Sequence, residues 1–459
     1  GTGNFFPFLL AISLRKKINS EFYAIFDVTD RQKPFYQNPM LILKVLFILI
    51  FIPFLQSQNI IDAYLIGNYT TTLMGTQAHG LILPRDLDFH KDIERQNELW
   101  VINENNLDGR NHGGSTVTYY NAGQDNQWAE YRRDTYSGHF MHTASAIAMS
   151  ENGTFGNPLD VQDANNSGGY FTGPVLWPSD TSIYARVNQN GPGLGSHLDM
   201  IHQTPFGEGI ASAGESVYWV FDGYHNAIVK YDFVNPHSAG GDYHSDGKVW
   251  RHSEVVVQRV SGLSSHMEFD PSSGWLYIAD TGNERIIRMD PNSGQIAGNL
   301  TPYGESLAGY WNMSGTVWNV VADTGLVQPT GLDIYEGRLL ISDYSNGDII
   351  VYDITQDPVV ELGRIETGIS NQIMGLKVGP EGEIWFVCHN AHELYQLTTL
   401  LMGDVNGDGS YTITDVILCV QYVMGFIDLE EDQIYRSDVN FDDEIDIFDV
   451  LLIVDVVIN

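Results

Sequence analysis

Two acidic segments near the end of the chain carry oxygen atoms at a spacing that suits a hard metal ion. The first, DVNGDGSYTITD from position 404, follows the pattern of a calcium-binding loop. Its predicted ligands are Asp404, Asn406, Asp408, the backbone carbonyl of Ser410, Thr412 and Asp415. Gly409 occupies loop position 6, where the backbone must turn sharply around the ion. The spacing therefore predicts a Ca²⁺ site.

The second segment, DVNFDDEIDIFD from position 438, repeats this spacing. Its predicted ligands are Asp438, Asn440, Asp442, Glu444, Asp446 and Asp449. Asp443 replaces the glycine, and aspartate tolerates the left-handed backbone better than most residues. One acidic stretch alone is often a solvated loop, but two stretches with identical spacing favour paired calcium sites.

The loops need short helices to hold them together. Each loop runs into an apolar segment, residues 416–424 and 450–458, with the spacing of a helix that packs on its twin. Residues 401–459 hold fourteen acidic residues and one basic residue, Arg436. Because such a segment repels itself, we expect folding and calcium binding to be coupled.

These tandem loops, with Asp at position 12, resemble a dockerin domain. The resemblance covers about sixty residues, 401–459, and implies a partner: a cohesin-like module or a cell-surface component. Dockerins are recognised mostly at loop positions 10 and 11, which here are Ile413 and Thr414, then Ile447 and Phe448. These residues depart from the Ser-Thr pair of one major dockerin class.

A repeated strand pattern fills residues 80–400. The clearest copy is HMEFDPSSGWLYIADTGNERIIRMD at 266–290, with further copies at 208–232, 330–353 and 374–397 and weaker ones from 85 and 145. Each copy offers three strands with polar turns, and the second strand ends near Asp or Asn. We therefore predict an all-β domain over residues 59–400, a six-bladed β-propeller, with segment 68–74 pairing with the final blade.

The repeat, with its DTGNERI turn at 280–286, resembles NHL repeats. Propellers of that kind include binding proteins, peptidyl-amidoglycolate lyases and gluconolactonase-like enzymes. The blades must also carry long inserts. We expect segments 166–180, 235–252 and 305–319 to build one decorated face above the central channel.

The first residues of the innermost strands should form a ring around the propeller axis. Alignment of the six copies places Arg85, Ser145, Glu208, His266, Thr330 and Met374 there. The resemblance to amidoglycolate lyases implies zinc on three such histidines, but only His266 matches, because Arg85 and Thr330 occupy the alternate places. His142 and Glu208 offer a different zinc or copper site with His266.

The ligand-binding candidates are therefore His266, Glu208, Arg85, His142, Thr330 and Met374, and the catalytic candidates are His266, Glu208 and Arg85. The motifs HFMH and DYHSD also contain possible transition-metal ligands, but we interpret the histidines other than His266 and His142 as loop or surface residues. Cys388 and Cys419 are interpreted as small buried hydrophobic residues.

Charge and the N-terminal sequence limit the function. The net charge of -35 argues against a nucleic acid partner, because phosphate binding needs clustered Lys and Arg. Residues 40–58 have the pattern of a signal peptide, and the apolar run is too short for a membrane span, so no span is expected after cleavage. Residues 1–39 are interpreted as an upstream extension.

The sequence thus predicts a secreted protein in which a propeller binds a glycan, peptide or small molecule and a calcium-stabilised module serves assembly or surface attachment. The alternative is a metal-dependent extracellular hydrolase or lyase at the propeller centre, acting in polysaccharide breakdown. No contiguous catalytic motif such as GxSxG or HExxH separates the two.

Overall fold

The computed structural model describes residues 59–65, 69–109, 111–241, 243–399, 401–407, 411–442 and 444–458. The predicted upstream extension and signal peptide lie outside the described residues, as do the predicted loop residues Asp408, Gly409, Ser410 and Asp443. The chain divides into two compact units, a large one of residues 63–398 and a small one that includes residues 399–459.

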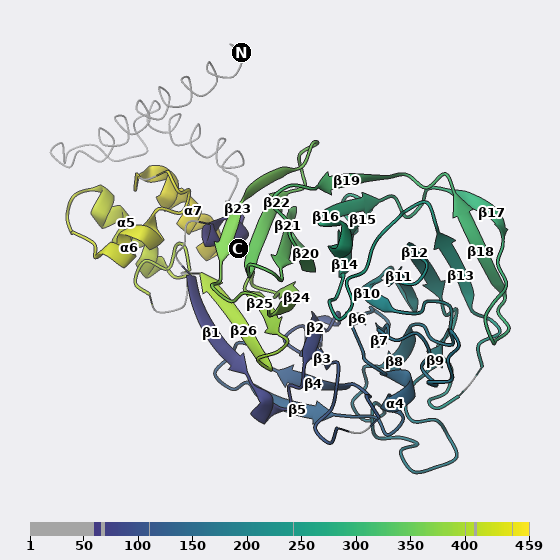
Figure 1. Cartoon of the computed structure of the whole chain (residues 1–459). Helices are drawn as coiled ribbons and strands as arrows, with labels where there is room; N and C mark the ends of the chain where they lie inside the picture. Colours follow the sequence, from purple (N-terminus) through teal and green to yellow (C-terminus); the bar gives the residue numbers. More distant parts are fainter. Residues whose placement is uncertain are drawn as a thin grey trace. The chain divides into compact units, whose positions relative to one another are not determined.

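The large unit is a six-bladed β-propeller, as predicted (Figure 1). Each blade is given from its innermost strand outward: the first is β2 (Pro84–Phe89), β3 (Leu99–Asn103), β4 (Ser115–Tyr120) and β5 (Trp128–Arg132), and the second is β6 (Ala148–Met149), β7 (Thr154–Asn157), β8 (Val175–Pro178) and β9 (Asp199–Met200). The third is β10 (Gly207–Ser212), β11 (Val217–Asp222), β12 (Ala227–Asp232) and β13 (Lys248–His252), and the fourth is β14 (Met267–Asp270), β15 (Trp275–Asp280), β16 (Arg285–Met289) and β19 (Trp318–Ala322). The fifth is β20 (Pro329–Tyr335), β21 (Arg338–Asp343), β22 (Asp348–Asp353) and β23 (Val360–Glu366), and the sixth is β24 (Ile373–Val378), β25 (Ile384–Cys388), β26 (Glu393–Thr399) and β1 (Tyr69–Gly75).

The hydrophobic core lies between neighbouring blades. The second strands, such as β11 with VYWVFD and β15 with WLYIAD, are rich in aromatic and β-branched residues that favour strands. Their sequences are continuous apolar runs because both faces of each of these strands pack against neighbouring blades. One cluster, for example, packs Trp219 and Phe221 of the third blade against Leu276 and Ile287 of the fourth.

The Asp or Asn that ends a second strand ties its blade to the loop before the innermost strand. The Asn103 side chain accepts a hydrogen bond from the Ile82 amide at 3.0 Å. Asp280 accepts one from the Gln258 amide at 2.7 Å, and Asp343 accepts one from the Val327 amide at 2.6 Å. These bonds explain why the repeat keeps a short polar residue at this place.

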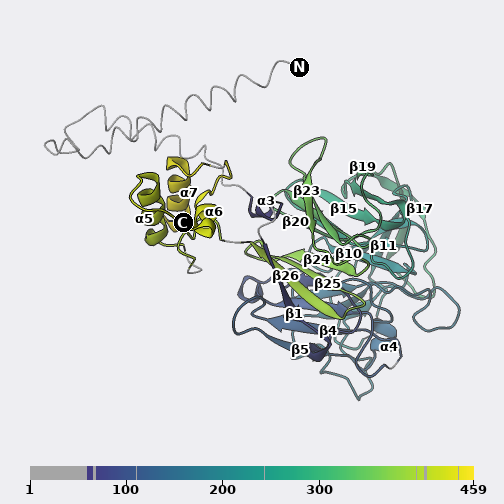
Figure 2. The same ribbon diagram turned by 60° about the vertical axis from the view of Figure 1, so that its left-hand side comes forward.

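The N-terminal strand closes the propeller. Strand β1 lies beside β26 as the outermost strand of the last blade, whose other strands come from the end of the domain (Figures 1 and 2). The predicted pairing of the 68–74 segment with the final blade is therefore confirmed.

A hairpin inserted in the fourth blade was not predicted. It consists of β17 (Gln295–Asn299) and β18 (Gly309–Ser314), which lie in sequence between β16 and β19. Strand β18 pairs in parallel with β13, so the hairpin extends the third blade to six strands. A pattern of apolar residues cannot show which sheet edge a hairpin will join.

The small unit contains α5 (Ile413–Val423), α6 (Glu431–Ser437) and α7 (Ile447–Ile458). Helices α5 and α7 begin three residues before the predicted segments, because the loop residue Thr412 caps α5 in a capping box with Asp415. Its core includes Val416, Cys419, Val450 and Ile453.

The remaining helices are short. They are α3 (Ile60–Tyr64), α4 (Ser137–Phe140), and the 3₁₀ turns η3 (Gln77–His79), η4 (Ile93–Arg95) and η5 (Thr281–Asn283). None of the helices in the described ranges has the length and hydropathy needed to cross a membrane. Both cysteines are free and buried, as predicted.

Candidate functional site

The end of the channel where the innermost strands begin is occupied by a buried network of ion pairs. Arg85 has no exposed surface, and its guanidinium lies 2.8 Å from Glu104, 3.3 Å from Glu208 and 3.5 Å from Asp160. Its Nε donates to the Ser264 hydroxyl at 3.1 Å. Arg85 thus links the first four blades.

Arg259 and His389 also belong to this network. Arg259 donates to Asp160 at 2.8 Å and to Glu208 at 3.0 Å, and His389 lies 3.2 Å from Glu104. Burial alone would raise the pKa of Glu104, but the hydrogen bond with His389 and the charge of Arg85 lower it to about 2. The predicted pair of Arg85 and Glu208 therefore meets, as part of a buried network of five or more charged groups.

His266 lies deeper in the channel. Its Nδ1 is 3.2 Å from Asp86, its Nε2 is buried without a hydrogen-bond partner, and the residue is 3% exposed. Burial, with the charges of Lys377 and Arg85, lowers the pKa of His266 to about 3. The imidazole is therefore neutral at pH 7.

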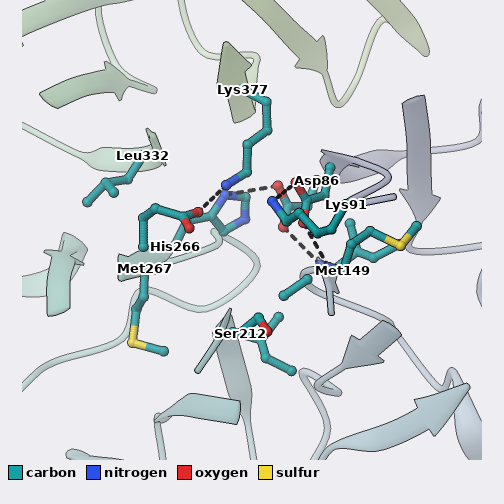
Figure 3. Close-up of a pocket in the computed structure, with 13 residues that line it drawn as sticks. Asp86, Lys91, Met149, Ser212, His266, Met267, Leu332 and Lys377 are labelled. Carbon is teal, nitrogen blue, oxygen red and sulfur yellow. Dashed lines mark hydrogen bonds and ion pairs between the residues drawn. The ribbon is translucent and has the colours of Figure 1, made fainter. Parts of the chain in front are cut away.

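An open cavity of about 640 Å³ lies at the opposite end, where the innermost strands finish. All six blades line it, and two lysines hold its carboxylates in place. Lys377 pairs with Glu268 and lies 3.1 Å from Asp333, and Lys91 lies 3.1 Å from Asp88. Figure 3 shows Lys377 and Lys91 pointing toward the same space as His266 and Asp86.

The cavity narrows toward His266. The inner pocket, which shares Lys91, Glu268 and Lys377 with the cavity and also contacts His266, has a volume of about 10 Å³. That volume holds about one water molecule. Only water or a very small group can therefore reach His266 from this side.

The other predicted ring residues serve the packing of the channel. The Thr330 hydroxyl donates to the Ile373 carbonyl at 3.0 Å, and Ser145 donates to the Gly207 carbonyl at 2.6 Å. Met374 is 1% exposed. His142 follows α4 and stacks on His112, and among the described residues no hydrogen bond or ion pair joins it to His266 or Glu208.

Several cavity residues were missed by the sequence analysis: Asp86, Asp88, Lys91, Glu268, Asp333 and Lys377. A sequence signal existed for two of them, because Asp333 and Lys377 are each the one charged residue of their innermost strand. The three inserts expected above the channel instead meet beside the outermost strands of the second and third blades. There Tyr170 packs on Tyr303, and His244 bonds to Asp199.

The two acidic loops have matching geometry in the small unit. In the first loop, Asp415 accepts the amides of Asn406 at 3.0 Å and Thr412 at 2.8 Å. In the second loop, Asp449 accepts the equivalent amides of Asn440 at 3.3 Å and Asp446 at 2.8 Å.

The donor set of these loops fits calcium. The described predicted ligands supply carboxylate, amide and hydroxyl oxygens, which a hard cation prefers. Burial, with the charges of Asp438 and Asp446, raises the pKa of Asp449 to about 7. A bound cation would relieve this repulsion, and Asp404, Asn406, Thr412 and Asp415, with Asp438, Asn440, Asp442, Glu444, Asp446 and Asp449, would hold it in the two loops.

The residues at positions 10 and 11 of the two loops differ in exposure. Ile413 is 63% exposed and Thr414 is exposed, whereas Ile447 is 6% exposed and Phe448 is half-buried. Ile417, one turn after Ile413 on α5, is 48% exposed. The first helix therefore presents Ile413 and Ile417 to solvent, with the polar residue Thr414 beside them at loop position 11.

Comparisons with known proteins agree with the division of the chain into a large and a small unit. Residues 402–456 match the family model of the dockerin type I domain, and such domains bind calcium. No curated protein matches the chain.

Several solved structures are similar to the chain at low sequence identity. An auxiliary nutrient binding protein from Bacteroides thetaiotaomicron is 12% identical with a TM-score of 0.47, and one from Bacteroides ovatus is 11% identical with a TM-score of 0.46. Each match covers 72% of this chain and 76% of that chain. A luciferin-regenerating enzyme is 12% identical, with a TM-score of 0.41 and coverage of 72% and 96%. The chain thus consists of a six-bladed β-propeller followed by a dockerin type I domain.

Proposed function

We propose that this protein is an extracellular ligand-binding propeller that its dockerin domain attaches to a cohesin-bearing partner. The observation that carries the proposal is the cavity lined by all six blades, in which Lys377 and Lys91 hold Asp333, Glu268 and Asp88. Its volume of about 640 Å³ lies within the range of small-molecule sites.

The charges of the cavity favour a neutral, hydroxyl-rich ligand such as the end of a glycan chain. Two lysines face six carboxylates, those of Asp88, Glu151, Glu268, Asp270, Asp333 and Glu336. This excess of negative charge opposes anionic ligands. The paired lysines and carboxylates offer fixed donors and acceptors, and hydroxyl groups can use both.

The dockerin domain supports the second half of the proposal. Its match over residues 402–456 implies a cohesin partner and an extracellular location, which agrees with the signal-peptide pattern at 40–58. The exposed residues Tyr411, Ile413, Thr414 and Ile417 supply an apolar surface for that contact.

Calorimetric titration of the full chain in calcium tests the ligand. We expect neutral oligosaccharides of two to four sugars to bind, and oligomers of uronic acids of the same length to bind at least tenfold more weakly. Lys91→Met should weaken binding, whereas Lys248→Met on β13, the fourth strand of the third blade, should not. Failure of every neutral glycan, with binding of an anion, would refute the proposed ligand class.

Pull-down with immobilised cohesin modules of several classes tests the partner. We expect capture that requires calcium and is lost in Ile413→Asp, with Ile434→Asp on α6 as the control, since Ile434 is 39% exposed outside the proposed contact. Capture that is equal in both variants would contradict the assigned surface.

One observation favours the alternative, a metal-dependent hydrolase or lyase with zinc or copper at the propeller centre. Nε2 of His266 is buried without a hydrogen-bond partner and Asp86 lies beside the ring. The charges of Lys377 and Arg85, which already lower the pKa of His266, oppose a cation there. Zinc or copper retained by the purified protein and lost in His266→Gln would favour the enzyme.

A further inference from the structure

A second group of titratable side chains lies outside the cavity, at the outermost strand of the second blade. Asp199 begins that strand, β9, and pairs in register with Leu176 of β8. His237 and Asp246 come from the connection between β12 and β13 in the third blade, which is the neighbour of the second (Figure 1). Two blades therefore contribute to this group.

Asp199 is the buried member of the group, with 1% of its surface exposed. One of its carboxylate oxygens, Oδ1, accepts the Met200 amide at 2.7 Å and lies 2.8 Å from Nδ1 of His244. The other oxygen, Oδ2, is buried and makes no hydrogen bond with the described residues. It lies 3.6 Å from Nε2 of His237, so the unpaired oxygen faces the rest of the group.

Nε2 of His237 faces both carboxylates, at 3.2 Å from Oδ1 of Asp246 and 3.6 Å from Oδ2 of Asp199. One ligand atom from each of the three residues lies within 4.8 Å of the other two. Around a tetrahedral Zn²⁺ with bonds of about 2.0–2.1 Å, ligand atoms are roughly 3.4 Å apart. An ion among these atoms would therefore lie on the same side of the imidazole as both oxygens. It would need only a small shift of Asp246, whose side chain is 25% exposed.

The charge of the group favours a cation. In the part of the chain that the structure describes, neither Asp199 nor Asp246 forms an ion pair with a lysine or an arginine, and their ion-pair partners are the imidazoles of His237 and His244. A buried carboxylate oxygen without a partner is costly. A divalent ion would satisfy Oδ2 of Asp199 and offset the charge of both carboxylates.

The histidine that orients Asp199 is itself held in place. The ring of His244 meets that of His202 edge to face, with centroids 5.4 Å apart. Glu305, from the turn between β17 and β18, accepts the His202 amide at 2.8 Å and lies 2.8 Å from its Nδ1. Carboxylates that bind metals are fixed by hydrogen bonds of this kind, which set the direction of the free oxygen.

The connection between β12 and β13 is anchored on both sides of its turn. The Gly240 amide donates to the His197 carbonyl of the second blade at 2.8 Å. Nearer to β13, the Gly247 carbonyl accepts from the Ala308 amide at 3.0 Å. The backbone that carries the two partly exposed members of the group is thus held against its neighbours.

We propose that Asp199, His237 and Asp246 bind a divalent transition-metal ion such as Zn²⁺, with His244 as the positioning residue of Asp199. One imidazole nitrogen and two carboxylate oxygens suit zinc, whereas calcium prefers oxygen atoms alone. The ion takes the place of the proton between His237 and Asp246, so the neutral imidazole binds through Nε2 and carries its proton on Nδ1. The chain then contains two kinds of metal site, one between two propeller blades and one in the dockerin loops.

The ion would join the second blade to the third. The described part of the connection between β12 and β13 contains no strand, so it lacks the ladder bonds that hold the blades. An ion that binds only the folded arrangement would stabilise it by mass action. With three protein ligands, a fourth position stays open to water or a ligand.

Zinc titration of the full chain in calcium tests this proposal, with the bound metal measured by elemental analysis. We expect one zinc ion per chain in the wild type. His237→Ala, Asp246→Asn and Asp199→Asn should each raise the dissociation constant by about 10- to 100-fold or more. His225→Ala is the matched control and should bind zinc like the wild type, because His225 also pairs with a buried aspartate, Asp222 at 2.6 Å, but lies outside the group.

Thermal unfolding gives a second readout. Zinc should raise the melting temperature of the propeller in the wild type and in His225→Ala but not in His237→Ala, and Asp449→Asn should lose calcium and keep zinc. If Asp199→Asn does not fold by circular dichroism, His237→Ala decides, because that side chain is 21% exposed. A wild type that takes up no zinc in calcium, equal zinc affinity in folded His237→Ala, or zinc lost only in His266→Gln would overturn the proposal.

Discussion

The buried guanidinium of Arg85 pairs with carboxylates from three blades. Replacing it by Met removes one of the two arginines that pair with Glu208, which has no exposed surface, and leaves Arg259 at 3.0 Å. Removing one partner from a buried ion-pair network costs about 3–5 kcal/mol. We therefore expect Arg85→Met to lower the free energy of unfolding of the propeller by that amount in urea titrations.

A matched surface variant gives the scale for this loss. Arg186 pairs with Glu130 at 3.0 Å but its side chain is 58% exposed, so Arg186→Met should cost less than about 1 kcal/mol. Equal losses in the two variants would mean that the Arg85 network is solvated and weak.

Glu104 in the same network should make stability depend on pH. Its pKa in the folded protein is about 2, below the ordinary 4.5, because the effects of His389 and Arg85 exceed that of burial. A depressed carboxyl pKa stabilises the fold above pH 4.5, and the contribution disappears as the pH falls toward 2. The free energy of unfolding of the wild type should exceed that of Glu104→Gln by roughly 2–3 kcal/mol at pH 7.

Urea titrations at a series of pH values measure that difference. It should shrink steadily below pH 4.5, since a protonated Glu104 resembles Gln. A difference that stays constant down to pH 3 would show that the carboxylate is not ionised by the network.

At the residue scale, the sequence predicted ligand types better than ligand geometry. Asp415 and Asp449 could be proposed as calcium ligands because each loop contains all the predicted ligands of its own site. Asp88, Asp333 and Lys377 come from separate blades, and only strand pairing with its bulges aligns them. His202, His244 and Glu305 come from three inserts that are far apart in the sequence. Only the docking of the inserted hairpin brings Glu305 close to the two histidines.

At the scale of elements, strand β1 should determine whether the ring closes. It supplies the outermost strand of the last blade, and without it β26 would expose an unpaired edge. We expect a chain that starts at residue 76 to aggregate or to melt well below a chain that starts at residue 59. Differential scanning calorimetry of the two proteins measures this, and equal melting temperatures would refute the closure.

The elements that the sequence predicted are those with local signals. The six innermost strands lie where the repeats indicated, since apolar runs recur and the second strand ends at Asp or Asn in five of the six blades. Hairpin β17–β18 was missed because its strand β17 is wholly exposed and has no buried face to create a pattern.

Helices α5 and α7 should depend on calcium. Asp415 and Asp449 each accept two loop amides and also contribute to the predicted ion sites, so the loops and helix starts are coupled. We expect hydrogen exchange in α5 and α7 to accelerate in chelator and in Asp415→Ala, even with calcium. Asp428→Ala, an exposed residue outside the loops, should match the wild type, and protection that persists in chelator would contradict the coupling.

At the scale of the whole molecule, the net charge of -35 should make stability sensitive to salt in an uneven way. Residues 401–459 carry fourteen acidic residues and one basic residue, Arg436, so the carboxylates repel one another over long distances. The charges of the Arg85 network are buried and paired, and salt screens such pairs little.

Raising NaCl from about 10 to about 150 mM shortens the screening length from about 30 to about 8 Å. In chelator, we expect this change to raise the melting temperature of α5 and α7, followed by helical circular dichroism, and to leave the propeller transition almost unchanged. In calcium the gain for the helices should be smaller, because the ions already offset the loop carboxylates. A fall in helix stability with salt would instead show that attractive ion pairs, such as Arg436 with Asp432 at 2.7 Å, outweigh the repulsion.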